Sequence, residues 1–259
     1  MTGVQTCALP ILEQIYPLVV VALGFGVLGI TGFGSALISV PLLAWVWPLQ
    51  QVVPLVLVID FIASLVLGGL QWKLIRLRDL LGLFGWIVAG VVLGAGVSAI
   101  PGVLQSGVLL MGLGLYVAWV GWQGLRGRPA ADGHGFQRPA VSGLAGGVIE
   151  VLWGTSGPVI VSHLVQRMED PLALRAHISL SLMFISGLAC VSMWLTGRAT
   201  HPEVLAWLPA LTGVALVSML IAHQWSKRAP VAQVRRAILA LLLISGLALV
   251  AQGLRQITS

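Results

Sequence analysis

The sequence predicts an all-α protein that crosses a membrane several times, built as an inverted repeat of two halves. Of its 259 residues, 58% are hydrophobic and only 8% are charged, whereas a soluble domain carries about 25% charged residues. The apolar residues form long runs, several of them near the roughly 20 residues that a membrane-crossing helix needs. A short glycine-broken pattern also recurs 122 residues apart. Together these observations exclude an ordinary soluble enzyme and a disordered chain.

Residues 1–11 are set apart from the rest of the chain. They read MTGVQTCALPI, which resembles the translation of a sequencing adapter, and we interpret them as a leader that is foreign to the native protein. A genuine short polar leader is the alternative. Because no basic residue precedes an apolar run here, these residues do not form a signal peptide.

The remaining chain divides into ten apolar segments, five in each half, around a polar loop at residues 126–139. We expect a first transmembrane repeat at 12–125 and a second at 140–259. The first half has segments at 15–30, 35–47, 52–72, 80–100 and 103–125, and the second has segments at 140–152, 158–166, 172–196, 204–223 and 231–254. The last three segments of each half are long enough to cross. Segments 35–47, 140–152 and 158–166 are too short, so each half is predicted to hold a broken-helix hairpin and three transmembrane helices.

The basic residues predict the orientation, because cytoplasmic loops of membrane proteins are enriched in lysine and arginine. Twelve of the 14 basic residues fall in four connections that this topology places on the cytoplasmic side. They are Lys73, Arg76, Arg78, Arg126, Arg128, Arg138, Arg167, Arg175, Lys227, Arg228, Arg235 and Arg236. This sorting requires one hairpin to open outward and the other to open inward, so the halves are inverted and loop 126–139 is cytoplasmic.

The recurring pattern lies at the predicted helix breaks. GFGSALISVPLL at residues 32–43 aligns without gaps to GTSGPVIVSHLV at residues 154–165. Broken backbone at membrane depth is tolerated only inside protein or beside a cavity. Paired interrupted segments at matching positions of two halves indicate the binding site of a transporter.

These motifs resemble those of the sulfite exporter TauE/SafE family of membrane permeases. The resemblance covers residues 15–256 and is carried by GVLGITGFGS (26–35), PLL (41–43), GLAGG (143–147) and GTSGP (154–158). It implies a multi-pass permease of the cytoplasmic membrane that moves a small anion outward, such as sulfite, a sulfonate or sulfoacetate. The chain departs from the family pattern at Glu150, Trp153 and His163.

The two breaks are the predicted anion site. Half-helices that begin at Ser35 and near Gly157 leave their first N–H groups unpaired, and the helix dipole adds partial positive charge there. Glycines let an anion approach the backbone, and nearby hydroxyl groups donate hydrogen bonds. The predicted substrate-binding residues are Thr31, Gly32, Gly34, Ser35, Gly154, Thr155, Ser156 and Gly157. The alternative is that these glycines only allow close helix packing.

Four ionisable residues lie in predicted spans or breaks, namely Asp60, Glu150, His163 and His177. Such groups are costly inside a membrane and indicate function. A carboxyl group beside an anion site repels the anion when ionised but donates a hydrogen bond when protonated, so these residues are candidates for proton coupling. The alternative is a neutral group bonded to a neighbouring helix or lining a water-filled vestibule.

The sequence indicates no enzyme, cofactor or metal site. It lacks the phosphate-binding pattern GxxxxGK[ST], and Cys7 and Cys190 have no metal-ligand spacing. The expected partners are a small anion, the lipid bilayer and protons as the coupling ion, with no nucleic acid. The alternatives left open are an anion channel, an intramembrane enzyme and a non-transporting membrane subunit.

Overall fold

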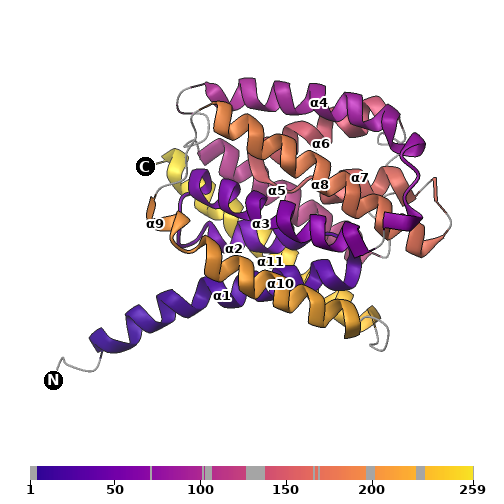
Figure 1. The fold of residues 1–259 in the computed structure, drawn as a ribbon. Helices are drawn as coiled ribbons and strands as arrows, with labels where there is room; N and C mark the ends of the chain where they lie inside the picture. Colours follow the sequence, from indigo (N-terminus) through magenta and orange to yellow (C-terminus); the bar gives the residue numbers. More distant parts are fainter. Residues whose placement is uncertain are drawn as a thin grey trace.

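The computed structural model describes residues 5–70, 72–100, 102, 107–126, 138–165, 167–168, 170–196, 202–225 and 231–258. Every regular element in these ranges is helical, which confirms the predicted all-α class (Figure 1). The elements are α1 (Gln5–Thr31), α2 (Ser35–Leu43), α3 (Leu49–Leu70), η1 (Trp72–Leu74), α4 (Arg78–Ala99), α5 (Gly107–Leu125), α6 (Pro139–Trp153), α7 (Gly157–Val165), α8 (Pro171–Leu195), α9 (Pro202–Leu205), α10 (Leu208–Trp225) and α11 (Val231–Thr258).

Five of the described helices are long and apolar enough to cross a membrane. They are α3, α4, α5, α8 and α10, and they match five of the six predicted crossings. The sixth predicted crossing, 231–254, is occupied by α11, whose described apolar stretch is Leu242–Arg255. Helix α1 begins at Gln5, ten residues before the predicted start at Ile15.

The three segments predicted to be short are the short helices α2, α6 and α7. Helix α2 forms an antiparallel hairpin with the longer α1, and α6 forms one with α7. In the first hairpin, α1 and α2 run in opposite directions, and the Tyr16 hydroxyl donates to the Leu42 carbonyl at 2.8 Å. In the second hairpin, α6 and α7 are joined by a 3.2 Å hydrogen bond between Ser142 Oγ and His163 Nδ1. Each hairpin therefore has its glycine-containing break at the tip.

The closest helix pairs join the first half of the chain to the second. Helix α1 packs on α10, α4 on α6, α3 on α8, and α5 on α11. Helices α4 and α6 lie along one side of the molecule and α1 and α10 along the opposite side, with α3 and α8 between them (Figure 1). The first helical segment of each half thus contacts the fourth helical segment of the other half.

Glycines bring two of these pairs into close contact, as small residues do inside membranes. Between α5 and α11, a Cβ atom on Gly114 would lie 2.6 Å from the Gly246 carbonyl oxygen. Between α4 and α6, a Cβ atom on Gly90 would lie 2.9 Å from the Gly143 carbonyl oxygen, and one on Gly147 would lie 2.6 Å from the Gly90 carbonyl carbon. No side chain larger than hydrogen fits these positions without separating the helices.

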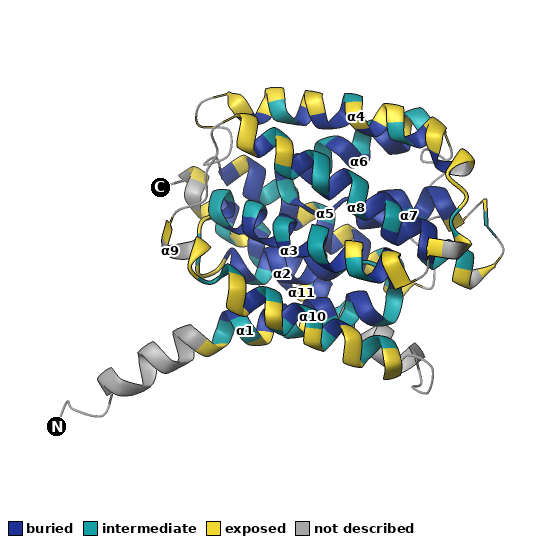
Figure 2. Cartoon of the chain, viewed as in Figure 1, coloured by how far each residue is buried: buried dark blue, intermediate teal, exposed yellow. Residues whose placement is uncertain are grey.

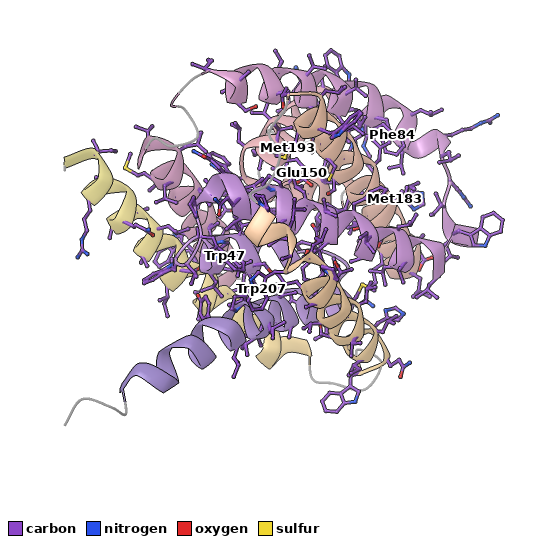
Figure 3. All side chains as sticks on the ribbon, turned by 60° about the vertical axis from the view of Figure 1, so that its left-hand side comes forward. Trp47, Phe84, Glu150, Met183, Met193 and Trp207 are labelled. Atoms are coloured by element: carbon purple, nitrogen blue, oxygen red, sulfur yellow. The ribbon has the colours of Figure 1, made fainter. Side chains whose placement is uncertain are left out.

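The outer surface is apolar along the long helices. Leu81, Val92 and Trp194 are 64%, 65% and 82% exposed, and exposed residues follow the outward face of α4 (Figure 2). An apolar surface of this extent suits lipid rather than water. Half-buried aromatic side chains pack against the core. The Phe84 and Phe184 ring centroids are 4.1 Å apart, and Trp47 packs against Trp207 (Figure 3).

Candidate anion site

Glycine conformation determines where the two hairpins break. Gly32 and Gly34 have φ values of 86° and 97°, and Gly154 has a φ of 68°. Residues with a Cβ atom rarely adopt this left-handed region, whereas glycine does so readily. The helices that follow begin at Ser35 and Gly157, which confirms both predicted starts.

The two hairpin tips meet inside the protein. A Cβ atom on Gly157 would lie 3.4 Å from Phe33 Cδ2 and 3.8 Å from the Gly34 nitrogen. The N-termini of α2 and α7 therefore face a common region. Each N-terminus carries a partial positive charge of roughly half a unit. At α7, Pro158 has no N–H group and the Val159 N–H donates to the Ser156 carbonyl at 3.0 Å.

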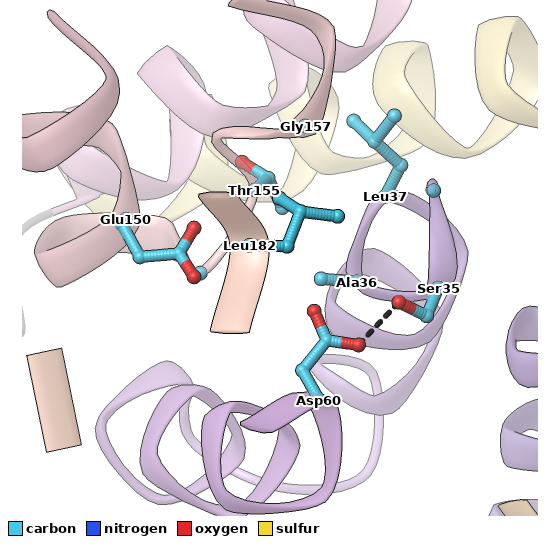
Figure 4. A pocket seen from close by; sticks show the side chains of 10 residues that line it. Ser35, Ala36, Leu37, Asp60, Glu150, Thr155, Gly157 and Leu182 are labelled. Atoms are coloured by element: carbon cyan, nitrogen blue, oxygen red, sulfur yellow. Dashed lines mark hydrogen bonds between the residues drawn. The ribbon is translucent and has the colours of Figure 1, made fainter. Parts of the chain in front are cut away.

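A buried pocket occupies this common region (Figure 4). Both tips, α3, α6 and α8 contribute to its wall. The lining residues are Gly34, Ser35, Ala36, Leu37, Asp60, Glu150, Gly154, Thr155, Gly157 and Leu182. Glu150 lies near the centre of the molecule (Figure 3), so the pocket is remote from the apolar outer surface.

Seven of the twelve predicted site residues line this pocket, five at the tips together with Asp60 and Glu150. Gly32, Thr31 and Ser156 belong to the breaks but are not part of the lining. The Thr31 hydroxyl lies 2.8 Å from the Val27 carbonyl oxygen and 2.6 Å from the Phe33 carbonyl oxygen, so it bonds to the backbone of its own hairpin.

Asp60 is the acidic residue at the first tip. It comes from the middle of α3, is 4% exposed, and accepts a hydrogen bond from the Ser35 hydroxyl at the start of α2 (Figure 4). Ser35 is the only hydrogen-bond partner that Asp60 has among the described residues.

Glu150 is the acidic residue at the second tip. It is 1% exposed, and its Oε2 accepts the Ser156 backbone N–H at 3.0 Å, directly before α7. Its Oε1 accepts the Ser186 hydroxyl of α8 at 2.5 Å. Because a backbone N–H only donates, this carboxyl group occupies the place at the helix N-terminus that an anion would take.

Unpartnered hydroxyl groups surround the second tip. Thr155 Oγ1 and Ser156 Oγ are buried and have no hydrogen-bond partner among the described residues. A buried hydroxyl without a partner is costly, so the Thr155 hydroxyl, which lines the pocket, is available to bind a ligand or water there.

Helix α5 braces the second tip. The Tyr116 hydroxyl donates to the Thr155 carbonyl at 3.1 Å, and the Trp153 indole N–H donates to the Leu109 carbonyl at 3.2 Å. The Tyr116 and Trp153 rings stack with centroids 6.1 Å apart. Trp153, which departs from the family pattern, therefore anchors the end of α6.

The two histidines lie outside the pocket lining. His163 is buried in α7 and bonds to Ser142 near the start of α6. His177 Nε2 accepts the Arg76 backbone N–H at 3.0 Å, and its Nδ1 lies 2.7 Å from the Ala173 carbonyl oxygen. His177 thus connects α8 to the segment before α4.

Residues 122 positions apart make matching contacts at the two tips, but their chemistry differs. At the first tip, a Cβ atom on Gly32 would lie 3.6 Å from Arg175 Cγ. At the second tip, a Cβ atom on Gly154 would lie 3.7 Å from Val53 Cγ1. One tip is therefore covered by a half-buried basic side chain and the other by an aliphatic one.

Three residues of the site, Ser186, Leu182 and Tyr116, were not predicted from the sequence. The repeat contained a signal for two of them, because Ser186 lies 122 residues after Ser64, and Leu182 lies 122 residues after Asp60. Nothing in the sequence distinguishes Tyr116, whose contact with Thr155 depends on the packing of α5. Among the described residues, no cluster of three or more His, Cys, Asp or Glu side chains could hold a metal ion.

Comparison with known proteins adds two similarities. Residues 16–249 match the family model described as Sulfite exporter TauE/SafE. The chain is also 32% identical over 199 residues to a protein of Comamonas testosteroni, "Probable inner membrane transporter protein TsaS", covering 75% of this chain and 81% of that protein. No solved structure matches the chain.

Proposed function

Because this chain belongs to the sulfite exporter TauE/SafE family and is a multi-pass membrane transporter rather than an enzyme, we propose that it is a secondary transporter of a small anion. Its substrate is sulfite, a sulfonate or sulfoacetate, carried outward across the cytoplasmic membrane. The description of the relative from Comamonas testosteroni as an inner membrane transporter supports this location.

The observation that carries this proposal is the meeting of two helix N-termini at one buried pocket. The N-termini of α2 and α7 together supply about one unit of positive charge, which balances a monovalent anion. No lysine or arginine is among the residues that line the pocket. Thr155 adds a buried hydroxyl without a partner, so both charge and hydrogen bonds favour an oxyanion.

The inverted repeat is part of the proposal, and the helix pairing supports it. A two-fold axis in the membrane plane would superimpose the α1–α10 helix pair on the α6–α4 helix pair. It would also make each helix antiparallel to the equivalent helix of the other half. Helices α3 and α8 meet this condition, because Gly68 lies opposite Ser179 and Phe61 lies opposite Gly187. The distribution of basic residues supports an orientation with Arg175 and the first tip toward the cytoplasm.

An anion channel would use the same pocket, so the test must separate a channel from a transporter. Purified protein in proteoliposomes is given radiolabelled sulfite, methanesulfonate or sulfoacetate, with and without a pH gradient. We expect saturable flux of at least one of these anions. Flux that rises in proportion to concentration would favour the channel, and no flux of any of them would contradict the proposed substrates.

Gly157→Leu tests the site itself, with Gly157→Ala as its control. The Ala Cβ would meet Phe33 at an ordinary 3.4 Å, whereas the larger Leu side chain would fill the space between the tips. We expect transport to be retained in Gly157→Ala and lost in Gly157→Leu at equal membrane insertion. Gly157 suits this test better than Gly34, whose φ of 97° would strain any side chain. Undiminished transport by inserted Gly157→Leu would reject the site.

A further inference from the structure

A carboxyl group of the protein itself lies at the α7 N-terminus in the pocket, and this has a consequence for how transport is coupled. The Glu150 carboxyl group accepts the Ser156 N–H at 3.0 Å and the Ser186 hydroxyl at 2.5 Å. Two donors, one of them a backbone N–H at a helix N-terminus, favour an ionised carboxylate. A substrate anion needs the same helix N-terminus, so substrate and carboxylate compete for it.

We propose that Glu150 holds the α7 N-terminus as a carboxylate when the pocket is empty, and takes up one proton when a substrate anion displaces it. Asp60 stays protonated in both states. This proposal rests on the proposed transport function and specifies its coupling: one proton accompanies each monovalent anion, and transport moves no net charge. Export is then driven by the outward concentration gradient of the anion and not by the membrane potential.

Charge balance in the pocket supports this assignment. The two helix N-termini supply about one positive charge. One ionised carboxylate balances it in the empty state, and one monovalent substrate balances it in the occupied state. Two ionised carboxylates would leave an excess negative charge in a buried site that no basic side chain lines, which is costly.

Hydrogen bonding distinguishes the two acids. Among the described residues, Asp60 has one partner, the Ser35 hydroxyl, and no backbone N–H. A hydroxyl group donates to or accepts from a protonated carboxyl group, so Ser35 is compatible with a neutral Asp60. Glu150 accepts a backbone N–H in addition to its hydroxyl partner, and because an N–H only donates, Glu150 is the better site for the negative charge.

The proton transfer is a simple exchange. A proton binds Glu150 Oε2, the Ser156 N–H leaves that oxygen, and the N–H then donates to a substrate oxygen. Other ionisable groups facing Glu150 are Asp60 on α3, Tyr116 on α5 and Cys190 on α8, while the nearest histidine on α7 is His163. Residues 80–99 of α4 contain no ionisable side chain.

Infrared spectroscopy of the purified protein at neutral pH without substrate tests the resting state. We expect the carbonyl band of one buried protonated carboxyl group, absent in Asp60→Asn and retained in Glu150→Gln. Loss of the band in Glu150→Gln but not in Asp60→Asn would overturn the assignment. This measurement needs no transported anion, so it separates failure of the coupling proposal from failure of the proposed function.

Flux measurements in proteoliposomes test the coupling, with methanesulfonate as a non-titrating monovalent probe. We expect wild-type flux to be driven by a pH gradient and unaffected by an imposed membrane potential, with one proton moved per anion. Glu150→Gln should lose the response to pH and gain a response to the potential, while the flux that Asp60→Asn retains should still be driven by the pH gradient. Potential-driven wild-type flux, or pH-driven flux in Glu150→Gln, would overturn the proposal.

Discussion

Replacing Gly154 tests whether left-handed glycine conformation holds the second tip open. Gly154 has a φ of 68° and a ψ of 20°, and its N–H donates to the Glu150 carbonyl at 2.7 Å. A Cβ atom there would lie 3.6 Å from Leu57 and 3.7 Å from Val53, which is ordinary contact. The penalty of Gly154→Ala therefore comes from the backbone alone, at about 1–2 kcal/mol.

This penalty sets the expected size of the effect. It lowers the population of the correctly formed tip about 5–30-fold relative to competing conformations, and it lowers the thermal unfolding midpoint by about 2–8 °C for a protein of this size. Asparagine tolerates the left-handed region better than alanine. We therefore expect stability and transport to decrease in the order Gly154, Gly154→Asn, Gly154→Ala.

Gly157→Ala is the matched control, because it makes the same chemical change three residues later. Gly157 begins α7, and its φ lies outside the left-handed region. Thermal unfolding in detergent and flux in proteoliposomes are measured for all variants at equal protein amounts. Equal losses in Gly154→Ala and Gly157→Ala, or an Asn variant as weak as the Ala variant, would refute the reasoning.

Three further predictions concern anion capture, packing and orientation. Arg175→Gln should raise KM for anions supplied from the cytoplasmic side roughly 2–5-fold at low salt, since a partly exposed charge contributes up to about 1 kcal/mol. The control is Arg126→Gln, which should leave KM unchanged because the Arg126 guanidinium lies over the Trp122 ring at 4.3 Å. Equal effects of the two variants on KM would contradict a role of Arg175 at the first tip. Gly90→Ala should destabilise the protein by about 1–3 kcal/mol in detergent unfolding because it overpacks the α4–α6 contact. Gly96→Ala should have no such effect, since Gly96 has open space around it. A Gly90→Ala variant as stable as the wild type would contradict the close packing of α4 on α6. Gly133→Cys, outside the described residues, should react with an impermeant thiol reagent in inside-out vesicles but not in intact cells, and labelling in intact cells would reverse the orientation.

Local sequence features predicted the hairpin tips well. The helix starts at Ser35 and Gly157 could be predicted because glycine-broken patterns identify a break whatever the tertiary structure. The hydrogen-bond partners at the second tip could not be predicted from the sequence. Ser186 reaches Glu150 at 2.5 Å only because α8 packs against α6, and Tyr116 reaches Thr155 only because α5 stacks on Trp153. Thr31 illustrates the same limit, since its hydroxyl bonds to its own backbone.

The unequal chemistry of the two tips has a consequence for the working cycle. In an inverted-repeat transporter, the inward-open and outward-open states arise when the two halves exchange conformations. Identical halves would make these two states equal in free energy. Here Asp60 corresponds to Leu182, Glu150 to Leu28 and Arg175 to Val53 at the 122-residue offset. If the two halves are the inverted repeat proposed above, these differences remove the degeneracy, and the resting protein then favours one side of the membrane.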